Sequence, residues 1–287
     1  MSIPFSKLNP DIPLPDRLGL IAGRGAYPLL LAESAKRQGV RHLMAVAFRR
    51  ETNPAINRLA DEVHWLKFGQ LEIMLETLRN ADIKQAVMAG QITPTSLFRL
   101  RPDRRSLQIL SGLRARNAHT IFGAVCAELQ NIGVTLLPAW RFMENAMPTP
   151  GRLSTREPTE RERSDIELGL RTAKAISGLD IGQTVAVKDG VILAVEGFEG
   201  TDAALLRAGK LGGPGMVAVK VAKQGHDMRF DIPIIGTKTI AVLKRAGASA
   251  LAVEAGRTIL LEREQVIRAA DRINLTMIAV TVDHGPN

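Results

Sequence analysis

The sequence has one cysteine, few aromatic residues and no long apolar run, and each shortage excludes a class of protein. The single cysteine, Cys126, rules out a disulfide framework and a thiolate metal cluster, and its apolar helical surroundings predict a buried structural thiol. No stretch approaches the roughly 20 apolar residues that cross a bilayer. Aromatic residues make up 4% of the chain, too few for the stacking platforms that bind single strands or RNA. We therefore expect no membrane span and no nucleic acid partner.

The N-terminal residues also lack a continuous apolar segment. Residues 1–17 carry four prolines and no h-region of a secretory signal, so we interpret them as an N-terminal arm and expect a cytoplasmic protein. The formal net charge of +9 favours an anionic partner. Charge alone leaves nucleic acid, a membrane surface and a phosphorylated small molecule as alternatives.

The chain is long enough for two domains, with 287 residues and 45% hydrophobic content. Residues 18–146 alternate short apolar runs with segments of helical spacing. Strands are expected at 18–23, 43–48, 63–68, 86–90 and 134–137, and helices at 27–38, 71–78, 104–113 and 119–130. This alternation predicts a mostly parallel sheet with helices on both faces, in a Rossmann-like N-terminal domain.

Residues 147–158 have no apolar period and are rich in Pro, Ser, Thr and Gly, which predicts a linker. The second domain, residues 159–287, opens with a capping box formed by Thr159 and Glu162. Asp189-Gly190 between two apolar runs predicts a hairpin, and therefore antiparallel strands. Further strands are expected at 216–221 and 277–282 and as a pair of 251–253 with 258–261, and further helices at 201–207, 237–246 and 264–273. We therefore expect an α/β protein whose second domain has a mixed sheet.

Glycines follow two of the strands expected in the first domain. Gly23-Arg24-Gly25 joins the first strand to the first helix, where backbone N–H groups and the helix dipole bind phosphate. Gly90 and Gln91 follow the fourth strand, at the carboxyl edge where open α/β sheets bind ligands. We predict that Gly23, Gly25, Gly90 and Gln91 bind substrate. The alternative is a plain strand-to-helix turn.

The same turn lacks the third glycine of the dinucleotide-binding fingerprint, because Tyr27 and Pro28 occupy the first turn of the helix. Arg49 and Arg50 follow the second strand, where an NADP-binding fold holds the 2′-phosphate. An NADP-binding oxidoreductase therefore remains an alternative function.

Carboxylates gather at two places in the second domain. Glu196, Glu199 and Asp202 lie in EGFEGTDA between a strand and a helix, where glycines permit an irregular backbone that suits magnesium or a catalytic water. Farther on, Asp227, Arg229 and Asp231 alternate, so in an extended segment they share one face. That face suits a phosphate and a metal ion, and its alternative is an exposed edge held by ion pairs.

The chain resembles the UDP-2,3-diacylglucosamine pyrophosphatase family. The matching segments preserve their order and spacing over nearly the whole chain. They are LGLIAGRGAYP near the N-terminus, the Ala89-Gly90 turn, DIGQTVAVKDGVILAVEGFEGTDAALLR from Asp180 to Arg207, RFDIPIIGTKTI from Arg229 to Ile240, and VEAGRTILLER from Val253 to Arg263.

The resemblance implies hydrolysis of the pyrophosphate of UDP-2,3-diacylglucosamine to UMP and 2,3-diacylglucosamine 1-phosphate in lipid A biosynthesis, with Mg²⁺ or another divalent cation. It places the family's essential aspartate at Asp231, which we predict to be catalytic and, with Asp227, to bind the metal. Thr201, Asp202, Lys223 and Arg229 complete the predicted substrate-binding residues.

The resemblance further implies a homodimer that exchanges domains. The basic surface is compatible with a peripheral contact at the cytoplasmic face of the inner membrane.

This sequence departs from the family pattern at two places. Gln224 and His226 stand where the family commonly has Pro and Gln, and Arg116-Asn117-Ala118-His119 stands where a helix often starts Lys-x-Asp-Asp. Two carboxylates are therefore absent at Ala118 and His119. Their loss leaves a non-enzymatic, lipid-nucleotide-binding homologue as the main alternative.

Overall fold

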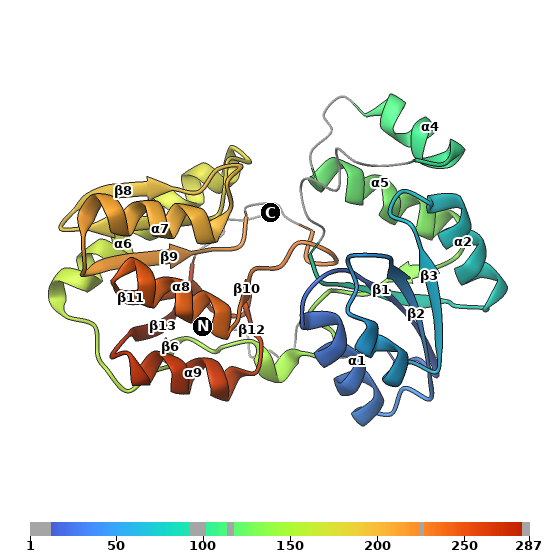
Figure 1. Ribbon diagram of the computed structural model, residues 1–287, viewed down its shortest axis with the longest axis horizontal. Helices are drawn as coiled ribbons and strands as arrows, with labels where there is room; N and C mark the ends of the chain where they lie inside the picture. The colour runs from blue at the N-terminus through green and yellow to red at the C-terminus, as the bar shows by residue number, and fades with distance from the viewer. Residues whose placement is uncertain (1–12, 92–101, 114–117, 224–226, 283–287) are drawn as a thin grey trace. The chain divides into compact units, whose positions relative to one another are not determined.

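The computed structural model describes residues 13–91, 102–113, 118–223 and 227–282 (Figure 1). The chain divides into two compact units, the first containing residues 1–143 and 227–231 and the second residues 144–226 and 232–287. Each unit combines helices with its own sheet. The predicted α/β class is confirmed.

The first unit has a five-stranded parallel sheet, in the order β3-β2-β1-β4-β5. Its strands are β1 (Arg17–Ala22), β2 (His42–Phe48), β3 (Glu62–Leu66), β4 (Gln85–Ala89) and β5 (Thr135–Leu136). β1 and β4 are neighbours at the point where the strand order reverses, the crevice in which open α/β sheets bind ligands. The Rossmann-like expectation is confirmed.

Five helical segments of the first unit are described. They are α1 (Tyr27–Arg37), η2 (Pro54–Arg58), α2 (Leu71–Asn80), α4 (Arg104–Gly112) and α5 (Ala118–Asn131). Met74 of α2 and Leu129 of α5 pack with Ile21 and Met88 of the sheet in one apolar cluster. Cys126 lies in the same cluster, where burial raises the pKa of its thiol to about 11. This burial confirms the predicted structural role.

The second unit has a six-stranded mixed sheet, in the order β6-β13-β11-β9-β7-β8. Its strands are β6 (Gly151–Arg152), β7 (Thr184–Lys188), β8 (Val191–Val195), β9 (Met216–Lys220), β11 (Ala248–Glu254) and β13 (Thr276–Val280). β9, β11 and β13 are parallel, whereas β7 and β8 form the predicted hairpin. Asp189 and Gly190 have φ of 54° and 76°, as a tight hairpin turn requires.

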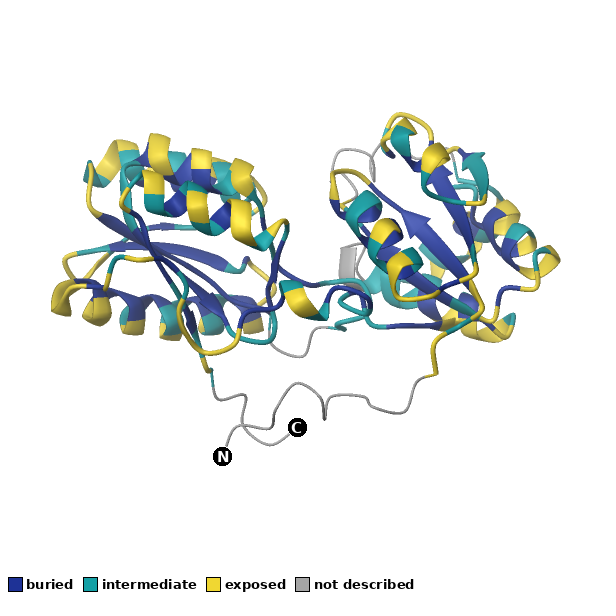
Figure 2. Cartoon of the chain, turned by 90° about the horizontal axis from the view of Figure 1, so that it is seen from below, coloured by how far each residue is buried: buried dark blue, intermediate teal, exposed yellow. Residues whose placement is uncertain are grey.

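Helices cover both faces of the second sheet. α6 (Glu160–Gly178) packs on one face, while α7 (Thr201–Gly212), α8 (Thr237–Ala246) and α9 (Arg263–Arg272) pack on the other. Figure 2 shows the buried strands between helices whose outer faces are exposed. The predicted capping box starts α6, with Thr159 and Glu162 bonding each other's backbone amide. No helix in the described part of the chain is long and apolar enough to span a bilayer.

One expected strand pairing is wrong. Residues 251–253 and 258–261 do not pair with each other, because β9 and β13 occupy both edges of β11. β12 (Ile259–Leu260) pairs instead with β10 (Ile234–Ile235), a short parallel strand that the sequence analysis did not anticipate.

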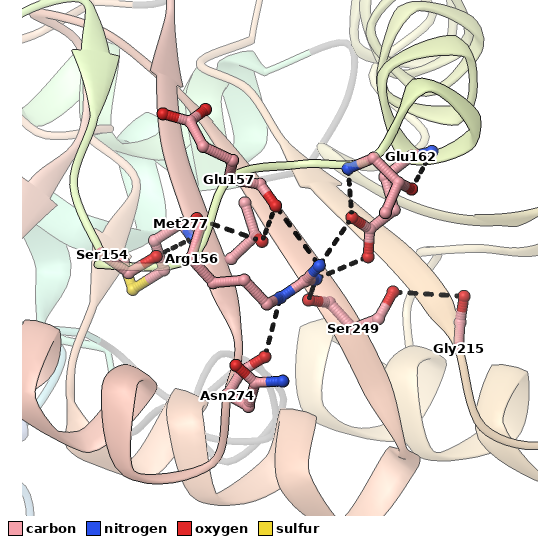
Figure 3. A network of polar contacts seen from close by, with 10 residues as sticks. Ser154, Arg156, Glu157, Glu162, Gly215, Ser249, Asn274 and Met277 are labelled. Carbon is pink, nitrogen blue, oxygen red and sulfur yellow. Dashed lines mark hydrogen bonds and ion pairs between the residues drawn. The ribbon is translucent and has the colours of Figure 1, made fainter.

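The segment expected as a linker contributes to the second unit. β6 pairs with β13, and the Arg156 guanidinium donates to Glu162, to Ser249 O and to Asn274 O (Figure 3). Burial would raise the pKa of Glu162, but hydrogen bonds from Arg156 and the Thr159 amide outweigh it and hold this pKa below its ordinary value. These contacts fix the chain before α6 to the sheet.

Candidate functional site

Two loops of the first unit meet at the carboxyl edge of its sheet. The Gly23 amide donates to Ala89 O over 2.7 Å, and Arg24 and Gln91 exchange backbone hydrogen bonds of 2.7 and 3.1 Å. The structure therefore brings together four residues predicted to bind substrate: Gly23, Gly25, Gly90 and Gln91. Their role in binding stays a prediction.

The close approach of these loops requires glycine. A Cβ atom at Gly90 would lie 2.7 Å from the Arg24 carbonyl oxygen, and one at Gly23 would lie 2.8 Å from the Gln91 carbonyl oxygen. Gly90 also has φ of 97°, which side chains rarely adopt. The two loops can pack against each other because neither glycine carries a side chain.

The amides of this turn are less available than expected. Those of Gly23 and Arg24 already donate to carbonyls of the β4 loop. These two amides are therefore not free to bind a phosphate in this structure. The amides of Gly25 and Ala26 are the candidates for an anion, because both precede Leu29, whose amide donates to Ala26 O at the start of α1.

Residues Asp227–Asp231 form a tight turn within the first unit. The Phe230 and Asp231 amides donate to Asp227 O over 3.1 and 3.0 Å. The expected extended segment is wrong, because the Asp227 carboxylate accepts from the Arg229 amide and closes a local turn. Asp227, Arg229 and Asp231 nevertheless lie within a single turn.

This turn is anchored on both sides of Arg229. The Met228 carbonyl accepts from the Ala139 amide over 2.8 Å. The Phe230 ring packs on Phe122 of α5, with 5.7 Å between ring centroids. Backbone and aromatic contacts therefore hold the turn against α5 and the loop after β5.

Arg229 and Asp227 form a tight ion pair. The Arg229 Nε lies 2.9 Å from both carboxylate oxygens of Asp227, and Nη2 lies 2.5 Å from Oδ2. This hydrogen bonding raises the pKa of Arg229 above its ordinary value. The guanidinium is thus held charged and oriented, as recognition of a phosphate requires.

The same ion pair bears on the predicted metal site. Within the described ranges, no three His, Cys, Asp or Glu side chains gather as metal ligands. Magnesium is often bound by one or two carboxylates together with waters and substrate phosphates. Asp227 and Asp231 are the two carboxylates of this turn that could serve in that arrangement, and Asp227 would do so only if Arg229 released it. The turn therefore fits an ion that arrives with a phosphorylated substrate.

In the second unit, the three acids expected near magnesium have separate partners. Glu196 is buried and accepts from Thr201 Oγ1 over 2.8 Å, while Thr201 in turn accepts from Lys220 Nζ over 2.8 Å. Glu199 pairs with Arg207, and Asp202 pairs with Lys238. The described residues thus do not show the expected gathering of these acids, and Thr201 belongs to a buried polar chain.

An ion pair with a buried carboxylate lies at the carboxyl edge of this sheet. Lys174 Nζ lies 2.7 Å from Glu254 Oε2 and 3.0 Å from Ala222 O, and the same Glu254 oxygen accepts from the Ala222 amide. Both backbone groups of Ala222 are thereby fixed, directly before Lys223, whose Nζ lies 2.7 Å from Asp180. This pair is not predicted from the sequence. The signal that was present is a carboxylate at the end of a buried apolar strand.

The units divide the candidate residues between them. The glycine loops, Asp227, Arg229 and Asp231 belong to the first unit, and Thr201, Asp202 and Lys223 to the second. Of the departures from the family pattern, Arg116, Asn117, Gln224 and His226 lie outside the described residues. Ala118 and His119 begin α5.

Comparisons with known proteins cover both units. A model of the LpxI N-terminal domain matches residues 17–146, and one of the LpxI C-terminal domain matches residues 149–278. UDP-2,3-diacylglucosamine pyrophosphatase LpxI of Caulobacter vibrioides is 32% identical over 286 residues, which cover 94% of this chain and 99% of that protein.

Similarity to solved structures is weak. The biotin carboxylase domain of a thermophilic 2-oxoglutarate carboxylase is 11% identical, with a TM-score of 0.27 over 59% of this chain and 34% of its own. Phosphoribosylglycinamide synthetase from Anaerococcus prevotii is 17% identical, with a TM-score of 0.24 over 62% and 37%. Neither likeness carries an argument about function.

Proposed function

The chain belongs to the LpxI family, and from this premise we propose that it hydrolyses the pyrophosphate of UDP-2,3-diacylglucosamine in lipid A biosynthesis. The products are UMP and 2,3-diacylglucosamine 1-phosphate. The observation that carries this proposal is the similarity over 94% of the chain to a relative named for that activity. The chain is thus a hydrolase that acts on a phosphoric anhydride bond.

We assign the chemical step to the Asp227–Asp231 turn. In hydrolysis, the oxygen of a water molecule bonds to one phosphorus, the bridging P–O bond breaks so that the bridging oxygen leaves with the other phosphate, and the proton lost by the water passes to solvent. Asp231 orients this water or the metal ion that activates it, and Arg229 pairs with phosphate oxygens on which charge develops. Asp227 holds Arg229 in place through their ion pair. Each group acts from one tight turn.

Magnesium or another divalent cation would neutralise negative charge on the two phosphates. In this proposal Asp231 is the protein ligand, as the resemblance to the family implies, and waters and phosphate oxygens would complete the shell. The amides of Gly25 and Ala26 and the Lys223 ammonium are further phosphate donors, and Gly90, Gln91, Thr201 and Asp202 are further substrate contacts. The positive helix dipole at α1 supports the first of these assignments.

We also propose a cytoplasmic homodimer that exchanges domains, and a peripheral contact with the inner membrane. Family membership supports the dimer, and the net charge of +9 supports attraction to anionic lipid. Light scattering at micromolar concentration and cosedimentation with anionic vesicles test the two proposals. A monomer without vesicle binding contradicts both.

The activity is tested on the purified full-length protein with UDP-2,3-diacylglucosamine, by quantifying UMP. We expect UMP release with magnesium, its loss in EDTA and its return when magnesium is added back. Binding of the lipid nucleotide without UMP release would identify a non-enzymatic homologue. Tight NADP binding without UMP release would favour an oxidoreductase.

A second test addresses the two glycine loops. Gly90→Ala places a Cβ atom 2.7 Å from the Arg24 carbonyl oxygen and forces the loops apart. We expect KM for the lipid nucleotide to rise about tenfold, equivalent to about 1.4 kcal/mol of binding energy. Steady-state kinetics of UMP release measure this change.

Gly133→Ala is the matched control, because Gly133 has φ of 79° and open space around a Cβ atom. It introduces the same conformational strain without moving the loops. Equal KM values for the two variants would mean that the glycine loops are only structural.

A further inference from the structure

The first unit contains an apolar cavity of about 90 Å³ that the proposed chemistry does not use. The sheet contributes Ile21, Phe48 and Met88 to its wall, and Ile109 of α4 and Phe122 of α5 line it from the helices, which leave it partly open. Figure 1 shows α4 beside α5 at the outer margin of the unit. Protein interiors are close-packed, so an apolar space of this size between a sheet and its helices needs an explanation.

The attachment of α4 explains why the space stays open. Asp103 caps α4, donates from its amide to Gly69 O over 3.0 Å, and accepts from the Glu72 amide over 2.7 Å. Ser106 donates to Gly69 O, and Arg105 pairs with Glu128 of α5. Polar contacts at the rim of the cavity therefore set the position of α4. The apolar side chains beneath α4 do not reach closest packing.

We propose that this cavity receives the end of one acyl chain of the substrate. The inference rests on the proposed function, which supplies a ligand with two acyl chains. The lining is almost entirely apolar, so a uracil, ribose or phosphate group would lose its hydrogen bonds there, whereas an alkyl chain loses none. The volume suits the terminal carbons of a chain, since an engineered cavity of about 150 Å³ holds benzene.

The cavity adjoins the turn that carries the candidate catalytic residue. Phe122 lines the cavity and packs on Phe230, which stands between Arg229 and Asp231. An alkyl chain in the cavity would therefore contact the same α5 side chain that supports the turn. This arrangement links acyl binding to the position of Arg229 and Asp231 within one unit.

The test reduces the cavity without touching the turn. Ile109→Phe fills the space from α4, and Leu107→Phe is the matched control, because Leu107 is 54% exposed on the same helix and does not line the cavity. We expect Ile109→Phe to lower kcat/KM about tenfold for a substrate with dodecanoyl chains, since each buried methylene contributes roughly fourfold to binding. The value for a butanoyl substrate and both values for Leu107→Phe should change less than about twofold, as surface substitutions do.

Equal losses for the dodecanoyl and butanoyl substrates in Ile109→Phe would overturn the inference and leave the proposed function intact. If the wild-type protein releases no UMP from any substrate, calorimetry with dodecanoate alone decides the inference. Binding by wild type and Leu107→Phe that weakens in Ile109→Phe supports an alkyl site. Absence of dodecanoate binding by the wild type overturns it.

Discussion

Asp231→Ala is expected to lower kcat for UMP release by about a hundredfold or more, the scale on which loss of one electrostatic stabiliser acts. If Asp231 holds a metal ion or orients the attacking water, its contribution is made mainly in the transition state, where charge develops on the pyrophosphate oxygens. Substrate affinity should persist or rise, because the variant removes an anion that faces an anionic substrate. Turnover and lipid-nucleotide binding are measured side by side.

The alternative to a catalytic Asp231 is that it only anchors Arg229. A residue that only anchored Arg229 in an exposed ion pair would contribute about 1 kcal/mol or less. The Arg229 guanidinium, however, donates to both carboxylate oxygens of Asp227, so Asp227 already anchors Arg229. Asp227→Asn should therefore raise KM more than it lowers kcat, in contrast to Asp231→Ala.

Asp82→Ala is the control for removal of an acid, because Asp82 forms an exposed ion pair with Lys84 in the same unit. It should leave both kinetic constants nearly unchanged. Circular dichroism confirms that each variant is folded. Near-normal turnover in folded Asp231→Ala would end the proposal and direct attention to Asp227 and Asp202.

Local signals in the sequence predicted the elements that depend on neighbouring residues. Asp189-Gly190 specifies its hairpin because both residues tolerate positive φ, and Thr159 with Glu162 starts α6 because each satisfies the other's amide. The alternation of apolar runs and helical spacing predicted the parallel sheet of the first unit. These features need no knowledge of the rest of the chain.

The features that sequence reasoning missed depend on distant partners. β10 and β12 have two residues each, and their pairing follows only once β9 and β13 have occupied the edges of β11. The Asp227–Asp231 turn looked extended because its residues alternate, yet a side-chain bond to the Arg229 amide closes it. Likewise, only the tertiary structure shows that the Gly23 and Arg24 amides are engaged.

Lys174→Ala is expected to lower the free energy of unfolding of the second unit by about 3 kcal/mol, since a buried carboxylate that loses its ammonium partner is strongly destabilising. Glu254 is 1% exposed, and Lys174 supplies its 2.7 Å partner. Arg257, at 3.8 Å, would compensate only in part. The variant also frees the Ala222 carbonyl from its lysine donor.

The measurement must separate the two units. Both tryptophans, Trp65 and Trp140, belong to the first unit, so tryptophan fluorescence follows that unit. Hydrogen exchange at β9 and β11 follows the second unit directly. We expect faster exchange in these strands in Lys174→Ala, with a smaller change in the fluorescence midpoint. Unchanged exchange in β9 and β11 would contradict the prediction.

Replacing both Lys174 and Glu254 distinguishes the effect of losing the ion pair from the effect of leaving one charge buried alone. Burial lowers the pKa of Lys174 even though Glu254 opposes the shift, so removal of the ammonium from water outweighs the attraction of its partner. A pair of this kind contributes little net stability, although breaking it is costly. Lys174→Met with Glu254→Gln should therefore restore most of the lost stability, because the glutamine oxygen can still accept from the Ala222 amide. A double variant as unstable as Lys174→Ala would mean that the ion pair itself stabilises the sheet edge before Lys223.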